Sequence, residues 1–115
     1  KQEYNIMETI IDLSKFRTVG SKVFTGRDRG VFVRNNSKID ELISLNKHIE
    51  IVVPDDIRSI NPSFLEEFLI NVVQKLGKDN FYKNVIFKTS GRYNIEEDLQ
   101  EAVDSILREE NGLSK

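Results

Sequence analysis

The sequence predicts an α/β domain with a mixed, mostly parallel sheet of four to five strands and three or more helices. Short apolar runs at 49–53 and 85–87 are rich in β-branched residues, as buried strands are. The stretches 62–76 and 95–107 carry apolar residues at helical spacing. Strands that alternate with amphipathic helices are typical of parallel sheets with right-handed crossovers. The length of 115 residues predicts one domain over 1–115.

Composition excludes several classes of function. The formal net charge of −2 arises from 19 acidic and 17 basic residues, which is too balanced for a general binder of nucleic acid or anionic membranes. The absence of cysteine excludes a disulfide-stapled secreted module and a thiol nucleophile. No apolar run reaches the roughly 18 residues of a membrane span, and the N-terminal residues show no signal-peptide core. We therefore expect a cytoplasmic protein without a cofactor.

The first strand is predicted near the N-terminus. Residues 4–13 mix β-branched and apolar side chains without a clear helical period, which favours a strand. Residues 14–21 contain several polar side chains and Gly20, so we expect them to form a connection.

The segment 25–45 has two interpretations. It forms either one helix, or a hairpin of 22–25 with 31–34 that is followed by a shorter helix from Ser37. We favour the single helix, because the hairpin loop would hold five residues with three charges. Gly30 would weaken that helix by about 1 kcal/mol relative to alanine, and a close approach of another backbone is the usual reason for such a glycine. The residues that the helix would bury are Val31 or Phe32, Ile39, Leu42 and Ile43.

A strand and a polar loop follow. The run 49–53 predicts a strand that is covered on both faces, and Pro54 ends it. The chain then turns through polar residues at 55–59, at the carboxyl end of the strand, where ligand sites of α/β proteins commonly lie.

The central helix starts at one of two caps. Asn61 is one candidate, because Pro62 then occupies the first helical position, where a missing N–H costs nothing. Ser63 is the other candidate, because a glutamate follows it at capping-box spacing. The apolar stripe continues to Leu76, and Gly77 is predicted to end the helix. The core residues predicted for this helix include Phe64, Phe68 and Val72.

A last strand and helix complete the domain. Residues 85–88 predict the strand, 89–93 a polar turn around Gly91, and Asn94 the cap of the final helix. The apolar face of that helix holds Ile95, Leu99, Ala102, Val103, Ile106 and Leu107.

The sequence contains no evident catalytic or metal-binding motif. His48 is the sole histidine, and it stands at a junction between elements with no cysteine to share a metal. Asp55 and Asp56 could bind Mg²⁺ or act as acid and base, but adjacent aspartates on a turn are more often solvated. Arg27 and Arg34 fall near one face of the predicted first helix. They form either a solvated face or a contact with an anion or an acidic partner.

The order of these motifs resembles that of the STAS-like family, which comprises relatives of the anti-sigma-factor antagonist domains. The resemblance covers roughly 24–107 and rests on four segments, of which the third is the most specific. These segments are FTGRDRGVFVR, IEIVVPDDI, INPSFLEEF and LGKDNFYKNVIFK.

The resemblance implies a docking surface in which the phosphorylation switch is altered or absent. The corresponding loop of STAS domains reads Asp-Ser-Ser-Gly, and a partner kinase of the histidine-kinase-like ATPase type phosphorylates its first serine. The matching positions here are Asn61, Pro62, Ser63 and Phe64. Proline thus stands at the acceptor position, and Ser63 is the remaining candidate for phosphorylation.

These observations predict a non-enzymatic, STAS-like regulatory domain that docks a protein partner such as an anti-sigma-type or histidine-kinase-like ATPase. An alternative is a small-ligand or nucleotide-binding domain that uses Arg27 and Arg34 as anion contacts. A third hypothesis is a hydrolase or transferase that uses Asp55, Asp56 and Ser63. The residues predicted to bind the partner are Asp55, Asp56, Arg58, Ser59, Asn61 and Ser63.

Overall fold

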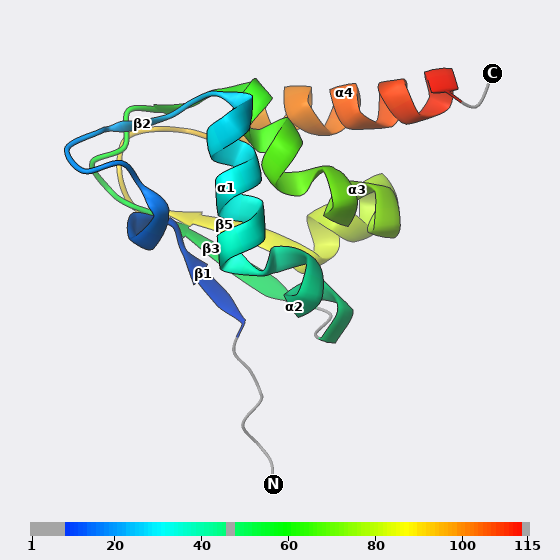
Figure 1. Cartoon of the computed structure of the whole chain (residues 1–115), viewed down its shortest axis with the longest axis horizontal. Coiled ribbons are helices and arrows are strands. Elements are labelled where there is room, and N and C mark those ends of the chain that lie inside the picture. The colour runs from blue at the N-terminus through cyan, green and yellow to red at the C-terminus, as the bar shows by residue number, and fades with distance from the viewer. Residues whose placement is uncertain (1–8, 46–47, 114–115) are drawn as a thin grey trace, which may run out of the picture.

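The computed structural model describes residues 9–45 and 48–113, in which strands and helices alternate (Figure 1). The strands are β1 (Ile10–Asp12), β2 (Val23–Phe24), β3 (Ile49–Val53), β4 (Ser59–Ile60) and β5 (Val85–Thr89). The helices are the 3-10 helix η2 (Leu13–Phe16), α1 (Arg27–Ser37), α2 (Ile39–Leu45), α3 (Pro62–Asn84) and α4 (Glu96–Leu113). The predicted α/β class is confirmed.

The described strands form two small parallel sheets. The larger sheet has the order β1-β3-β5, in which Ile51 of β3 lies opposite Ile11 on one side and Phe87 on the other. β2 and β4 form a separate pair. The prediction of four to five strands in one sheet is therefore wrong. The chain turns directly after β3, where the amide of Ile57 donates to the carbonyl of Pro54 (3.2 Å), so β4 forms away from the larger sheet.

One face of the larger sheet is covered by helices, and the other face is partly exposed. In β3, Ile49 and Ile51 are fully buried, whereas the alternate residues Glu50 and Val52 are half-buried. The prediction that this strand is covered on both faces is therefore wrong. The crossover from β1 to β3 and the crossover from β3 to β5 each join neighbouring parallel strands, and both move across the sheet in the same direction. Right-handed crossovers of this kind place their helices on the same face of the sheet. α3 packs against both α1 and α4, so these helices form one layer (Figure 1).

The first described strand is shorter than the predicted strand over 4–13. It comprises Ile10–Asp12, and residues 4–8 of the prediction lie outside the described part of the chain. The carboxylate of Asp12 accepts a hydrogen bond from the amide of Ser14 (3.0 Å) and caps η2, which ends the strand. η2 buries Leu13 in the core.

Neither interpretation of 25–45 is fully correct. α1 and α2 are two helices, because Lys38 adopts a left-handed backbone conformation (φ 62°) between them. The segment 22–25 contains a strand, as the hairpin interpretation required, but β2 pairs with β4 and not with 31–34.

The buried face of α1 also differs from the prediction. Val33 is fully buried, whereas Phe32 is 43% exposed and Val31 is half-buried. In α2, Ile39 and Ile43 are buried as predicted.

Gly30 lies where α1 crosses α3, and it explains why these helices pack so closely. A Cβ atom at this position would lie 2.5 Å from the carbonyl oxygen of Phe64 and 2.8 Å from the Cβ of Glu67. The close backbone approach that the sequence predicts at Gly30 is therefore confirmed.

α3 starts at the first of its two candidate caps and bends at Gly77. The Asn61 side chain accepts a hydrogen bond from the amide of Ser63 (2.8 Å), so Asn61 is the cap. The backbone of Gly77 is not helical (φ 80°, ψ 169°), and the segment before it matches the predicted helix. The helical segment 78–84 that follows was not predicted, and it places Phe81 in the core. The residues of α3 that were predicted to be buried are buried in the structure: Phe64, Phe68 and Val72.

α4 has the predicted cap and the predicted buried face. The Asn94 side chain accepts a hydrogen bond from the amide of Glu96 (2.9 Å). Ile95, Leu99 and Val103 are buried, and the helix continues past Gly112 to Leu113. Among the described residues, no helix is long and apolar enough to cross a membrane.

Candidate functional site

The candidate site lies at the carboxyl ends of β3 and β5. We call residues 54–63, which follow β3, the edge loop, and residues 90–93, which follow β5, the return turn. β3 and β5 are neighbouring parallel strands, so the segments that follow them leave the sheet at the same edge.

Long-range backbone hydrogen bonds hold the edge loop. The amide of Arg58 donates to the carbonyl of Lys22 (2.7 Å), and the amide of Asn61 donates to the carbonyl of Phe24 (2.8 Å). The side chains of Ile57 and Ile60 are buried beneath the loop. The loop therefore has an ordered backbone, from which its polar side chains project.

The return turn packs directly against the edge loop. A Cβ atom at Gly91 would lie 2.2 Å from the carbonyl oxygen of Asp55, so a glycine is needed at this contact. The hydroxyl of Tyr93 lies 3.1 Å from the carbonyl oxygen of Ile60 and also donates to the carboxylate of Asp98. Burial raises the pKa of Tyr93, so the hydroxyl remains protonated and continues to donate.

An open hollow of about 580 Å³ separates the exposed parts of the two segments. Asp55 and Arg58 line it from the edge loop, and Ser90 and Arg92 line it from the return turn. Within the described part of the chain, Asp55, Arg58 and Arg92 are exposed and make no ion pair. These three charged groups are therefore available to a partner or a ligand.

Asp56 differs from its neighbour Asp55, because its carboxylate is already bound. Arg17 donates two hydrogen bonds to it, at 2.9 and 3.1 Å, and also donates to the carbonyl of Ser21. The hydrogen bonds from Arg17 hold the pKa of Asp56 below its ordinary value. Asp56 thus joins the edge loop to the connection after η2, whereas Asp55 and Arg58 make no such ion pair among the described residues.

The cap of α3 joins two of the predicted docking residues, Asn61 and Ser63. The Ser63 hydroxyl donates to the side-chain oxygen of Asn61 (2.6 Å), which also accepts from the Ser63 amide. Ser63 is half-buried, whereas Ser59 and Asn61 are exposed. The hydroxyl of Ser63 is therefore part of the cap.

Arg27 and Arg34, the predicted anion contacts, form ion pairs between α1 and α3. Arg27 lies 3.0 Å from the carboxylate of Glu66, and Arg34 donates to the backbone carbonyl of Glu67 (2.7 Å) and pairs with its carboxylate at 3.7 Å. An anion at this position would compete with both glutamates, and the anion-contact hypothesis remains a prediction.

The described residues form no metal-binding cluster. No group of three histidine, cysteine, aspartate or glutamate residues is arranged to hold a metal ion there. Of the three residues in the third hypothesis, Asp56 binds Arg17 and the Ser63 hydroxyl donates to Asn61, whereas Asp55 is exposed. That hypothesis stays a prediction. His48 is exposed, as expected for a residue at a junction.

Sequence reasoning missed the contribution of the return turn and of Arg17. The return turn could have been found, because it follows a strand predicted to lie in the same parallel sheet as β3. Arg17 gave no such signal, since 39 residues separate it from Asp56. Comparisons with known protein families, curated proteins and solved structures gave no match for this chain.

Proposed function

We propose that this chain is a non-enzymatic regulatory domain that binds a protein partner through the edge loop. The proposal rests on one observation: the edge loop has an ordered backbone and presents charged side chains that make no ion pair among the described residues. Asp55 and Arg58 project from a loop that is already fixed by its bonds to Lys22 and Phe24. A loop that is ordered before binding loses little conformational freedom when a partner docks, which favours affinity.

The partner class follows from the resemblance to STAS-like domains. In that family the corresponding loop docks a histidine-kinase-like ATPase, and we propose a regulatory ATPase or kinase of this class as the partner. The mixed charges of the edge loop support a partner with complementary charges, because such charges speed association and select the partner. Pro62 and the bonded hydroxyl of Ser63 support a docking mode without phosphorylation of the loop.

Charge reversal at Arg58 is the sharpest test of this function. Arg58→Glu changes an exposed side chain that makes no ion pair among the described residues, whereas Asp56→Arg would place a cation beside Arg17 and disturb the fold. Glu101→Lys, an exposed position on α4, is the matched control. The proteins that co-purify with each variant from native cells are identified, and the recovered ATPase or kinase is tested with purified components.

We expect Arg58→Glu to slow association of that partner about tenfold or more at low salt, with Glu101→Lys close to the native protein. Equal partner recovery by all three proteins would reject the edge loop as the docking surface. The edge loop would also be rejected as a docking surface if no protein co-purified and a small molecule stayed tightly bound instead.

The hollow between Arg58 and Arg92 supports a second candidate, a small anionic ligand. Two exposed guanidinium groups at the rim of a 580 Å³ hollow are suited to a carboxylate or a phosphate. Mass spectrometry of the purified protein under non-denaturing conditions separates the two functions. A ligand-binding domain would carry an added mass that Arg92→Glu removes.

A further inference from the structure

Among the described strands, β5 lies at the edge of the larger sheet and is paired on one side only. It pairs with β3 alone in the larger sheet, from Val85 opposite Ile49 to Thr89 opposite Val53. In the described part of the chain, the one other backbone bond of this strand is the helix-capping bond from the Val85 amide to the Phe81 carbonyl. Alternate residues of β5 therefore point their N–H and C=O groups away from the sheet, where an extended chain can bind them.

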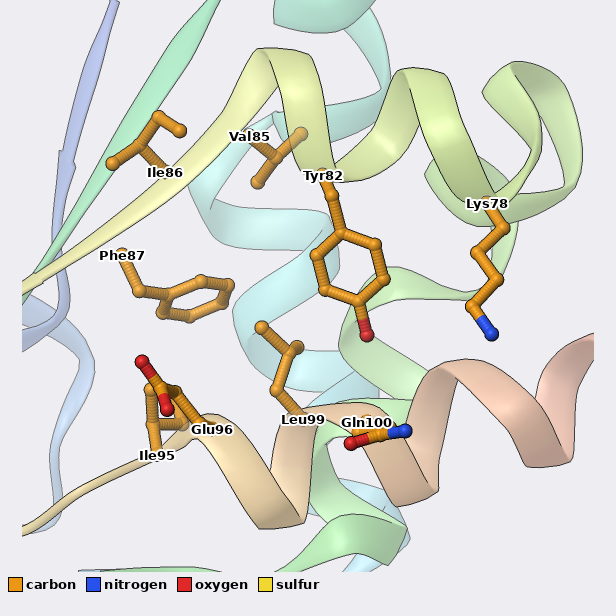
Figure 2. A pocket seen from close by; sticks show the side chains of 9 residues that line it. All are labelled: Lys78, Tyr82, Val85, Ile86, Phe87, Ile95, Glu96, Leu99 and Gln100. Atoms are coloured by element: carbon orange, nitrogen blue, oxygen red, sulfur yellow. The ribbon is translucent and has the colours of Figure 1, made fainter.

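An apolar groove runs beside this free edge, between β5 and α4 (Figure 2). Its volume is about 510 Å³, and Val85 and Phe87 wall it on the strand side, while Ile95 and Leu99 wall it on the helix side. Figure 2 shows the ring of Phe87 and the side chain of Leu99 approaching the groove from its two sides. An extended chain that paired with β5 would place alternate side chains against these apolar walls.

The hydroxyl of Tyr82 is an unpaired donor at this groove. Its oxygen is buried and has no hydrogen-bond partner among the described residues. Figure 2 shows the hydroxyl pointing from the end of α3 toward α4, near Leu99 and Gln100. Burial raises the pKa of Tyr82, so the group stays protonated and can donate. Because this oxygen is covered, a backbone carbonyl in the groove reaches it only when the neighbouring side chains move aside, and the hydroxyl then gains the acceptor that it lacks.

The charges at the ends of the groove are opposite. Lys78 lies at the end near Tyr82, and Glu96 lies at the end near Phe87 (Figure 2). Lys78 pairs with Asp104 at 3.4 Å, but an ammonium group has three donors and can bind a second anion. The groove therefore matches a segment with an acidic residue at the Lys78 end and a basic residue at the Glu96 end.

We propose that this groove binds an extended peptide segment of a partner protein, which adds to β5 as a fourth strand of the larger sheet. The free backbone edge selects a polypeptide, the apolar walls select a nonpolar side chain, and the end charges select its flanking residues. A single strand fits better than a second copy of the chain, because each copy would bring its own α4 to this edge. The site is separate from the edge loop.

The first test selects peptides from a phage-displayed library of random nonapeptides on the native chain. Synthetic versions of the enriched peptides are then titrated by fluorescence polarisation. We expect an apolar residue flanked by an acidic and a basic residue, and about two- to tenfold weaker binding to Tyr82→Phe, which loses one hydrogen bond. The double variant Lys78→Glu with Glu96→Lys should weaken binding and favour the peptide with its two charges exchanged.

The control for this test is Arg58→Glu, which alters the edge loop and should bind the peptides as the native protein does. The proposal for the peptide site and the proposal for the edge loop can therefore be confirmed or rejected separately. The proposal is overturned if no peptide is enriched, or if the groove variants bind as the native protein does. It is also overturned if analytical ultracentrifugation shows a dimer that Lys78→Glu and Glu96→Lys dissociate, because the occupant is then a second copy.

The second test asks whether the bound peptide forms a strand. N-methylation of alternate peptide amides should abolish binding, and N-methylation of the intervening amides should be tolerated, because alternate amides face β5. Hydrogen exchange of the outward-facing amides of β5 should slow at the same time. Peptides that tolerate N-methylation at every position would bind by side chains alone and would refute strand addition.

Discussion

The Gly30→Ala variant separates two effects on stability: the close packing of α1 on α3 and the higher helix propensity of alanine. Alanine is favoured over glycine inside a helix by about 1 kcal/mol, so propensity alone predicts a more stable protein. In this fold the new Cβ would lie 2.5 Å from the carbonyl oxygen of Phe64 and 2.8 Å from the Cβ of Glu67. Neither atom can turn aside, so α1 must shift away from α3. Overpacking against atoms that cannot move lies at the upper end of the usual range, about 2–3 kcal/mol, which leaves a net loss of about 1–2 kcal/mol.

Urea unfolding of the native protein and two variants measures this effect. With a slope of about 2 kcal/mol per molar, the midpoint for Gly30→Ala should fall by about 0.5–1 M. Asn35→Ala is the matched control, because Asn35 is an exposed residue of the same helix and should gain several tenths of a kcal/mol from propensity. A Gly30→Ala protein that is more stable than the native one would refute the close approach of the two helices.

Four further predictions follow from the packing, the cap and the edge loop. Phe68 is fully buried, so Phe68→Ala should cost about 3–5 kcal/mol, and an unchanged melting temperature would contradict its place in the core. Asn61→Ala should cost about 1 kcal/mol and Ser63→Ala less, since Asn61 accepts the capping bond; urea midpoints in the reverse order would assign the cap to Ser63. Arg17 lowers the pKa of Asp56, so this pair stabilises the fold above about pH 4 and loses its effect as the pH falls further. The stability of Asp56→Asn should therefore depend less on pH in the acid range, and the same pH dependence in both proteins would contradict the pairing. A kinase of the histidine-kinase-like type with ATP should leave Ser63 unmodified, and the stoichiometric addition of one phosphate in the intact mass would overturn this expectation.

Local chemistry made the caps and the close helix contact predictable. Asn61 and Asn94 each stand directly before an apolar stripe, and their side chains accept the capping bonds that this position requires. Gly30 interrupts a helix at a cost that a close backbone approach explains. In each case a single residue type has few structural roles, so the sequence predicted the close approach at Gly30 and the role of Asn94, and it reduced the cap of α3 to two candidates, Asn61 and Ser63.

Features that depend on distant segments were not predictable. β2 and β4 are two residues long, which is too short for any periodic pattern, and their pairing depends on a contact between Phe24 and Ile60. Lys38 adopts the left-handed conformation without being a residue type that signals a break. The face of α1 that buries Val33 is set by its packing on α3, where Gly30 meets Phe64, and these residues are far apart in the sequence.

The edge loop and the β5 groove use the same sheet in different ways. At the edge loop, backbone groups are already paired, through Arg58 to Lys22 and Asn61 to Phe24, so side chains alone remain to select a partner. At β5 no described strand pairs with the outer backbone, so the main chain of a partner can supply affinity there and the walls of the groove can supply selectivity. A partner that engaged both surfaces would gain from their linkage, because binding at one raises its effective concentration at the other. Arg58→Glu would then slow the encounter, while Tyr82→Phe would speed dissociation, and the two effects on the rates would be separable in one kinetic experiment.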